Sequence, residues 1–377
     1  MIIKNGTVFS EDGSFHKMDI ETTNGLITAI GDGLPHQNRD ILDAEDAYVV
    51  PGIVDIHIHG AVGMDFSDGT PEAIEKIARY LVSCGVTSFL GTTMSVPEEQ
   101  LSTFCRAAHP YVNANRPDMA VMRGIHLEGP FFSKEKRGAQ NADYLVSPDI
   151  PMFKRLNAIS DNNVKLIAVA PEEEGGLEFV KEIAPLCTVS LAHSTADYET
   201  ACKAFSLGSN HVTHLFNGMN PLNHREPGIV GAAFDSGAYV ELISDGVHIN
   251  PSVIRVVFEL FDDDKICLIS DSMRACGLTD GKYDLGGQVV TVVGRLATIE
   301  NNSIAGSVSP LTECMRRAVE FGVPLPKALK AATINPAKSV GLDSEVGSLS
   351  VGKRADILVL EKDLKLKQIV FGGALIS

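Results

Sequence analysis

The sequence lacks the features that direct a chain into a membrane or out of the cell. A membrane-spanning helix needs a run of about 18 uninterrupted apolar residues, and the 377 residues contain no such run. The first residues, MIIKNGTVFSEDG, contain no charged leader followed by an apolar segment, so no secretory signal is expected. The seven cysteines are scattered and form no C-x-x-C pair, which is typical of reduced thiols. We therefore expect a cytoplasmic protein.

Positive charge is scarce as well. The chain carries 32 Lys and Arg against 48 Asp and Glu, which gives a formal net charge of −16. Such a chain is not expected to bind nucleic acid or an anionic membrane. If the substrate is an anionic small molecule, a few positively charged side chains at its binding site must overcome the negative charge of the rest of the chain. The length exceeds that of one usual compact core, so a large domain plus a smaller one is expected.

Strand-forming residues broken by glycines concentrate at both ends of the chain. They occur in MIIKNGTVF and GLITAIGDG near the start, and in ADILVLEKDL and KQIVFGGALIS near the end. We expect residues 1–50 and 346–377 to form one small β-sandwich domain. Residues 51–345 are then a large domain inserted between the two termini.

The middle of the chain alternates between apolar, β-rich runs and helix-like stretches. Eight such runs occur, at 53–59, 86–93, 121–128, 164–170, 187–193, 211–216, 239–245 and 265–271. This alternation predicts an α/β fold with a (β/α)₈ TIM-like barrel. The rival is an open doubly wound sheet, which usually carries a G-x-G-x-x-G phosphate loop after its first strand, and none follows the first run here.

Polar residues end several of these runs, where barrel enzymes carry their catalytic groups. His57 and His59 share one face of the first run because side chains alternate along a strand. Glu128 ends the third run just before Gly-Pro, and His193 and His214 lie near the ends of the fifth and sixth runs. Imidazole and carboxylate groups are ligands for divalent metals. The sequence therefore predicts a metal site built from these five residues.

Asp271 ends the eighth run. A carboxylate beside a metal site is the usual general base for hydrolysis, so we assign that role to Asp271. His126 is interpreted as a structural residue that points to the face opposite Glu128. His211 lies too early in its run to join the site.

The chain resembles the amidohydrolase superfamily, and specifically the N-acetylglucosamine-6-phosphate deacetylases. The resemblance lies in PGIVDIHIHG, GIHLEGPF, LAHS, THLFNGMNPLNHREPGIVGA, ELISDGVHI and ISDSMRACGLTDGKYDLGG. It implies a barrel with a small β domain, usually in a homodimer, that converts N-acetylglucosamine 6-phosphate to glucosamine 6-phosphate and acetate. It implies that Glu128, His193 and His214 hold a metal and that Asp271 is catalytic. The retained His57 and His59 leave room for a second ion, so we expect one or two divalent ions (Zn, Fe, Mn or Co) per subunit.

The resemblance also implies how the sugar phosphate is bound. The phosphate-binding residues of the family match Asn217, Gly218, Arg225 and His248, with the arginine supplied by the neighbouring subunit. One departure concerns the G-[AT]-H triplet of many relatives, which is Gly138-Ala139-Gln140 here. Because a glutamine can still donate an N–H, we expect Gln140 to contact the substrate.

Two alternatives stay open at this point, and a third is disfavoured. A deacetylase for the galactosamine epimer would carry the same motifs. A non-catalytic scaffold on the same fold would be expected to lose ligands, whereas all the candidates are present here. A cyclic amidase usually carries a carboxylated lysine at a strand end, and Lys165 lies too early in the fourth run for this.

Overall fold

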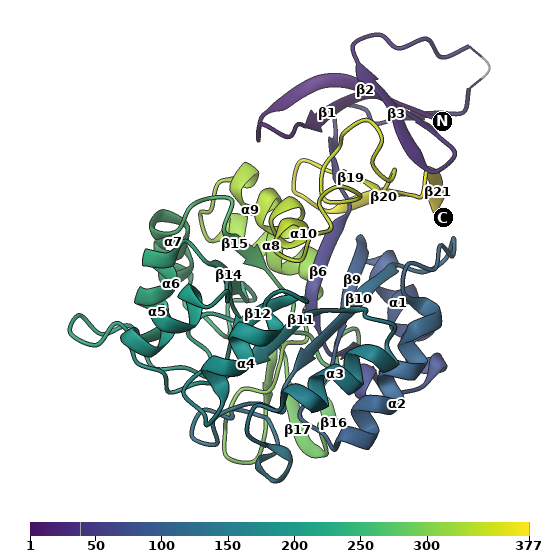
Figure 1. Cartoon of the computed structure of the whole chain (residues 1–377). Helices are drawn as coiled ribbons and strands as arrows, with labels where there is room; N and C mark the ends of the chain where they lie inside the picture. The colour runs from purple at the N-terminus through teal and green to yellow at the C-terminus, as the bar shows by residue number, and fades with distance from the viewer. Residues whose placement is uncertain (38, 377) are drawn as a thin grey trace.

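The computed structural model describes residues 1–37 and 39–376, in which strands from both termini share one sheet (Figure 1). The strands of this sheet are β1 (Ile2–Phe9), β2 (Phe15–Thr23), β3 (Leu26–Gly31), β4 (Ile41–Asp43), β5 (Tyr48–Pro51), β19 (Ile357–Leu360), β20 (Leu366–Phe371) and β21 (Ala374–Ile376). Their order is β21-β20-β19-β5-β1-β2-β3, and β4 pairs with β1. The predicted β domain formed by both termini is confirmed, whereas its exact boundaries stay a prediction.

The two ends of the chain meet where β5 pairs antiparallel with β19, with Val49 opposite Val359. Val8, Ile20 and Ile357 pack with these valines in one buried cluster. Apolar β-branched residues suit such a pleated, buried surface, and the cluster therefore joins segments that lie more than 300 residues apart in the sequence.

Eight parallel strands form the second sheet, the barrel. They are β6 (Ile53–Ile58), β9 (Val86–Thr92), β10 (Val121–Glu128), β11 (Val164–Val169), β12 (Thr188–Leu191), β13 (His211–Val212), β14 (Tyr239–Leu242) and β15 (Ile266–Leu268), paired in chain order. Each lies within one of the eight predicted runs. Every residue of β6, β9 and β10 is buried, as expected for parallel strands covered on both faces. The first and last strands meet where the Asp271 N–H donates to the His57 carbonyl (2.9 Å).

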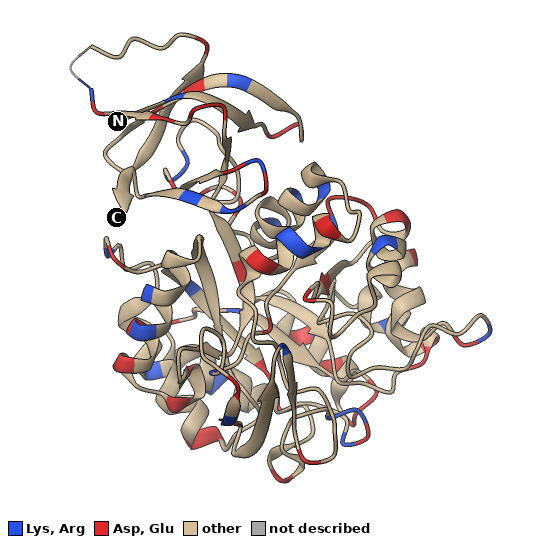
Figure 2. Ribbon diagram, turned by 180° about the vertical axis from the view of Figure 1, so that it is seen from behind, with Lys and Arg blue, Asp and Glu red and all other residues tan. Residues whose placement is uncertain are grey.

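Helices surround these strands (Figure 1). They are α1 (Pro71–Ser83), α2 (Glu98–Ala108), α3 (Ile150–Ile159), α4 (Gly176–Ile183), α5 (Tyr198–Ser206), α6 (Gly228–Ser236), α7 (Pro251–Leu260), α8 (Leu311–Glu320), α9 (Leu325–Ala332) and α10 (Ile334–Ser339). In α1, Thr70 caps the first turn by accepting from the Ala73 N–H, and Ile74, Ile77 and Leu81 face the core. Acidic and basic residues are interspersed over the outer helices and loops (Figure 2). The net negative charge is therefore spread over the surface.

A small antiparallel sheet is inserted between β15 and α8. It contains β16 (Gly281–Leu285), β17 (Gln288–Val293) and β18 (Leu296–Thr298). This sheet was not predicted from the sequence. Gly286 and Gly287 form the turn between β16 and β17 at positive φ (57° and 81°), which is typical of a two-residue hairpin.

Candidate active site

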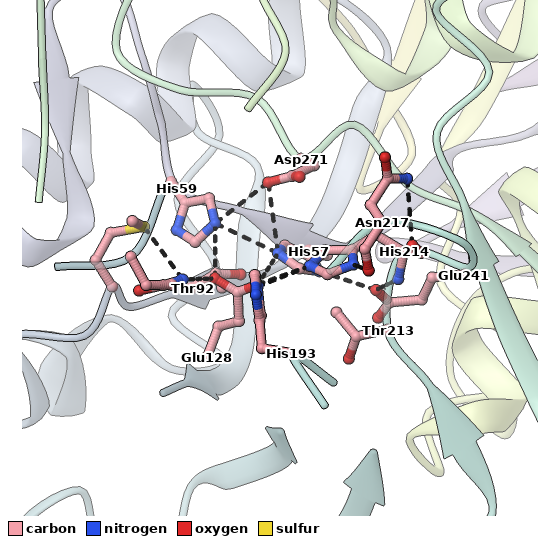
Figure 3. A network of polar contacts seen from close by, with 12 residues as sticks. His57, His59, Thr92, Glu128, His193, Thr213, His214, Asn217, Glu241 and Asp271 are labelled. Carbon is pink, nitrogen blue, oxygen red and sulfur yellow. Dashed lines mark hydrogen bonds and ion pairs between the residues drawn. The ribbon is translucent and has the colours of Figure 1, made fainter. Parts of the chain in front are cut away.

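The structure brings the six predicted metal-site and catalytic residues together at the carboxyl ends of the barrel strands (Figure 3). His57 lies in β6, with His59 just beyond its end, and Glu128 is the last residue of β10. His193, His214 and Asp271 lie two or three residues beyond β12, β13 and β15. All six side chains are buried. Loops after short strands therefore carry half of the site.

Glu128 and two histidines form the first half of the site. Glu128 Oε1 lies 3.0 Å from His214 Nε2 and 3.3 Å from His193 Nε2. The two Nε2 atoms lie 3.2 Å apart. Three potential ligand atoms thus point at one another from three different strands.

The other ring nitrogen of each histidine faces a backbone carbonyl. His193 Nδ1 donates to the Lys136 carbonyl (2.8 Å), and His214 Nδ1 donates to the Asn217 carbonyl (3.1 Å). Because a carbonyl only accepts, each Nδ1 carries a proton, and a neutral ring then presents a lone pair at Nε2. Two such lone pairs facing a carboxylate repel one another unless a cation lies between them. The donor set therefore fits a divalent metal.

His57 and His59 form the second half of the site. Their Nε2 atoms lie 3.3 Å apart. His59 Nε2 lies 3.3 Å from Glu128 Oε2 and 3.2 Å from Asp271 Oδ1. Both His57 and His59 therefore cluster with Glu128 in a second group that could hold an ion. The Glu128 carboxylate lies between the two groups, with Oε1 near His193 and His214 and Oε2 near His59.

The charged groups of the cluster shift one another's pKa values. In the metal-free chain burial raises the pKa of Glu128, but hydrogen bonds from His193, His214 and His59 outweigh burial and hold the pKa well below its usual range. Burial likewise opposes ionisation of Asp271, and the neighbouring histidines His57 and His59 outweigh it and lower its pKa. Asp271 is therefore ionised at neutral pH and can accept a proton.

The backbone is strained at three of these residues. His193, His214 and Asp271 have φ values of 44°, 27° and 45°, in the left-handed region that non-glycine residues seldom adopt. Gly218 follows the same pattern at φ 63°, and a Cβ there would lie 2.8 Å from His193 Nδ1. Glycine is thus required at position 218 for the loop to pass over the histidine ring.

A cavity of about 310 Å³ opens over this cluster. The predicted residues that line it are His59, Glu128, Gln140, His193, His214, Asn217, Gly218, His248 and Asp271. Leu285 and Ile304 add apolar walls from the inserted sheet and its neighbouring loop. His57 lies beneath the floor and is fully buried. The cavity is large enough for a hexose derivative and brings the predicted substrate residues next to the predicted metal site.

Two of the predicted substrate residues are held in place by hydrogen bonds. Gln140 Nε2 donates to Glu128 Oε2 (2.6 Å), while its Oε1 accepts from the Ser95 N–H (2.8 Å). His248 Nδ1 donates to Asp245 Oδ2 (2.9 Å). Gln140 therefore contacts the proposed ligand Glu128 directly, and Nε2 of His248 is left for a ligand in the cavity.

Arg225 is the one predicted site residue that lies apart from the others. It is exposed on the loop between β13 and α6, which projects from the body of the barrel (Figure 1). It lines a separate hollow with Asn223 and Glu226 and not the cavity over the cluster. In a single chain this arginine is therefore not brought to the site.

Two features of the site differ from the sequence analysis. His126 faces the barrel interior on the same side as Glu128, with its ring edge-on to His57 (centroids 4.6 Å apart), so the predicted opposite face was wrong. Residues two apart on a strand share a face, which is the physical reason. Glu241 was missed. A lone carboxylate between Val240 and Leu242 in an apolar strand was the available signal, because a buried charge needs a partner.

Comparison with known proteins gives a consistent picture. Residues 48–375 match the model of the amidohydrolase family. An N-acetylglucosamine-6-phosphate deacetylase of Lysinibacillus sphaericus is 35% identical over 99% of this chain and 97% of that protein. An N-acetylgalactosamine-6-phosphate deacetylase of Escherichia coli O157:H7 is 31% identical over 100% and 99%. A solved structure shows an aspartate-to-alanine mutant of the Mycobacterium smegmatis N-acetyl-D-glucosamine-6-phosphate deacetylase in complex with N-acetyl-D-glucosamine 6-phosphate. It superposes on this chain with a TM-score of 0.93 at 30% identity, over 100% of this chain and 98% of that one.

Two further observations concern the predicted location. Among residues 1–37 and 39–376, no helix is both long and apolar enough to cross a membrane. All seven cysteines are free thiols, and Cys105, Cys267, Cys276 and Cys314 are buried.

Proposed function

The chain belongs to the amidohydrolase family, and we propose that it is a metal-dependent hydrolase that converts N-acetylglucosamine 6-phosphate to glucosamine 6-phosphate and acetate. The observation that carries the proposal is the buried cluster of four imidazoles and two carboxylates under a cavity of sugar size. The deacetylase relatives, which the chain covers over nearly their whole length, supply the substrate class.

In this proposal Glu128, His193 and His214 would hold one divalent ion, and His57, His59 and Glu128 are the residues that would hold a second one. The ion is Zn, Fe, Mn or Co. A bound divalent cation lowers the pKa of water and polarises a carbonyl group, which are the two aids that an unreactive acetamide needs. Gln140 keeps the Glu128 carboxylate in place through its 2.6 Å hydrogen bond.

Asp271 carries the proton in this mechanism. Its Oδ1 faces the cluster and accepts the proton of the attacking water as the new C–O bond forms at the acetyl carbon. The same carboxyl group then donates that proton to the sugar nitrogen as the C–N bond breaks, which leaves the free amine and acetic acid, and the acid ionises to acetate. The lowered pKa of Asp271 suits the first step, because the base must be ionised before the attack.

Asn217, Gly218 and His248 line the cavity and would bind the sugar phosphate. We propose that Arg225 completes this site from the neighbouring subunit of a homodimer. An arginine fork pairs with two phosphate oxygens at once, and its exposed loop is placed to reach outside its own chain. The substrate and a second copy of the chain are thus the partners proposed, in the cytoplasm.

Turnover of the two epimeric substrates tests the proposal. The metal-loaded protein is incubated with N-acetylglucosamine 6-phosphate or N-acetylgalactosamine 6-phosphate, and acetate and free amine are both quantified. We expect equal amounts of the two products and a kcat/KM at least ~10-fold higher for the glucosamine epimer, with unphosphorylated N-acetylglucosamine as control. A reversed preference supports the galactosamine alternative, which the Escherichia coli relative also favours. No hydrolysis by a metal-containing protein supports a scaffold.

A further inference from the structure

Beneath the cluster lies a carboxylate that the mechanism above does not use. Glu241 projects from the middle of β14 into the barrel interior and is fully buried. Its Oε2 accepts from His57 Nδ1 at 2.8 Å and from the backbone N–H of His214 at 3.2 Å (Figure 3). One oxygen atom thus contacts a residue of each half of the site.

We propose that Glu241 is a positioning residue that fixes the His57 ring so that its Nε2 is free to bind the second metal ion. The proposal rests on the proposed function, since it concerns the same metal site. A carboxylate only accepts, so the short contact to Nδ1 places the proton of a neutral His57 ring there and the lone pair at Nε2. That Nε2 faces His59 (3.3 Å), Asp271 (3.5 Å) and Glu128 (3.7 Å).

The surroundings of His57 leave Glu241 as the side chain that orients it. His126 stands edge-on to the His57 ring, and neither of its ring nitrogens has a hydrogen-bond partner within the part of the chain that the structure describes. The histidines of the first half use backbone carbonyls for the same purpose. His57 instead uses a charged acceptor, and an anionic partner raises the basicity of a metal-binding imidazole.

The same carboxylate also connects the two halves of the site. Besides the hydrogen bond to the His214 N–H, the Glu241 carbonyl accepts from the Leu215 N–H at 2.8 Å, on the strained segment after β13. The position of the first-half ligand His214 therefore depends on the same strand as that of His57.

Metal titration of chelator-stripped protein with Zn²⁺ tests the proposal in Glu241→Gln, which keeps the size of the side chain and an acceptor oxygen. Bound zinc is counted at each concentration by elemental analysis after equilibrium dialysis. We expect wild type to bind two ions, and Glu241→Gln to bind the first within about threefold of wild type and the second about 10–100-fold more weakly. The double variant Glu241→Gln/His57→Ala should bind like His57→Ala alone, because Glu241 acts through His57.

Asp55→Asn is the matched control. Asp55 is also fully buried, and its Oδ1 accepts from the backbone N–H groups of His57 and Ser270 (3.3 Å each). Asp55→Asn should leave the dissociation constant of the second ion within about threefold of the wild-type value, since Asn offers the same acceptor oxygen. An equal weakening in Asp55→Asn would mean that any change of a buried carboxyl group to an amide has this effect and would overturn the proposal.

The remaining outcomes are also decisive. Unchanged binding of both ions by Glu241→Gln, or a single ion bound by wild type, overturns the proposal while the proposed function stands. Wild type that binds no zinc contradicts both. Should Glu241→Gln fail to fold, Glu241→Asp replaces it. This variant keeps the charge but withdraws it from His57 by about 1.5 Å, so the second ion should again weaken, and wild-type binding there would refute the positioning role.

Discussion

Replacing Asp271 by asparagine removes the proposed proton carrier while changing little else. The side chain keeps its shape, and the hydrogen bond from its backbone N–H to the His57 carbonyl (2.9 Å) is untouched. Glu128 and the histidines of the first half are not altered, so that ion should stay bound. What is lost is a carboxylate Oδ1 at 3.2 Å from His59 Nε2, on the floor of the cavity. An amide has no proton affinity in this range and cannot serve as a general base.

The expected loss follows from the value of a positioned acid–base group, about 10²–10⁴-fold in rate, which is about 2.7–5.5 kcal/mol in the barrier. We therefore expect kcat of Asp271→Asn to fall at least ~10²-fold, with bound metal unchanged by elemental analysis. Asp65→Asn is the control. Asp65 is buried and caps a 3₁₀ turn (Phe66–Asp68) by accepting from the Ser67 N–H at 2.8 Å. The kcat of Asp65→Asn should stay within about twofold of the wild-type value. Near-normal kcat in Asp271→Asn with full metal content would refute the assignment.

The remaining predictions concern metal, phosphate and stability. Glu128→Gln should lose both ions, whereas His57→Ala should keep one; elemental analysis that finds full metal in Glu128→Gln contradicts the ligand assignment. Arg225→Ala should raise KM at least ~10-fold for the phosphorylated sugar only, and co-expression with the inactive variant above should restore about a quarter of wild-type activity through mixed dimers. Heterodimers without activity would place the arginine outside the neighbouring site. Gly218→Ala puts a methyl group 2.8 Å from His193 Nδ1 at φ 63°, so the first ion should bind at least ~10-fold more weakly, and unchanged affinity would contradict this. Burial lowers the pKa of His57, but three neighbouring carboxylates outweigh it and raise the pKa to about 9 in the metal-free chain. The stability that this proton contributes is complete below about pH 6.5 and is lost as the pH rises through 9, so calorimetry of chelated protein should show Tm falling over that window and falling less with metal bound.

The fold was predictable because its strands are buried on both faces. Runs such as 53–59 and 121–128 are mostly apolar, with Asp55 and Arg123 as exceptions near their starts and with polar residues again where the strand meets the cavity, and this pattern is visible without a structure. The inserted sheet at 281–298 could also have been predicted from the sequence, since Gly286-Gly287 between two alternating segments is a hairpin signal.

Other features depend on conformations that the sequence does not display. His193 and His214 lie beyond their strands in left-handed conformations that non-glycine residues seldom adopt, so their exact geometry follows from tertiary contacts such as the Lys136 and Asn217 carbonyls. The partner of Arg225 belongs to a second chain in the proposal, and no single sequence pattern supplies that contact.

The most direct test of the central claim is the activity of the protein with its metal removed. Chelator-treated protein, with folding checked by circular dichroism, is assayed with N-acetylglucosamine 6-phosphate before and after adding back Zn²⁺, Fe²⁺, Mn²⁺ or Co²⁺. We predict that acetate release falls at least ~10³-fold on metal removal and returns as bound metal approaches one or two ions per chain. Full acetate release by a folded protein without metal would contradict the account.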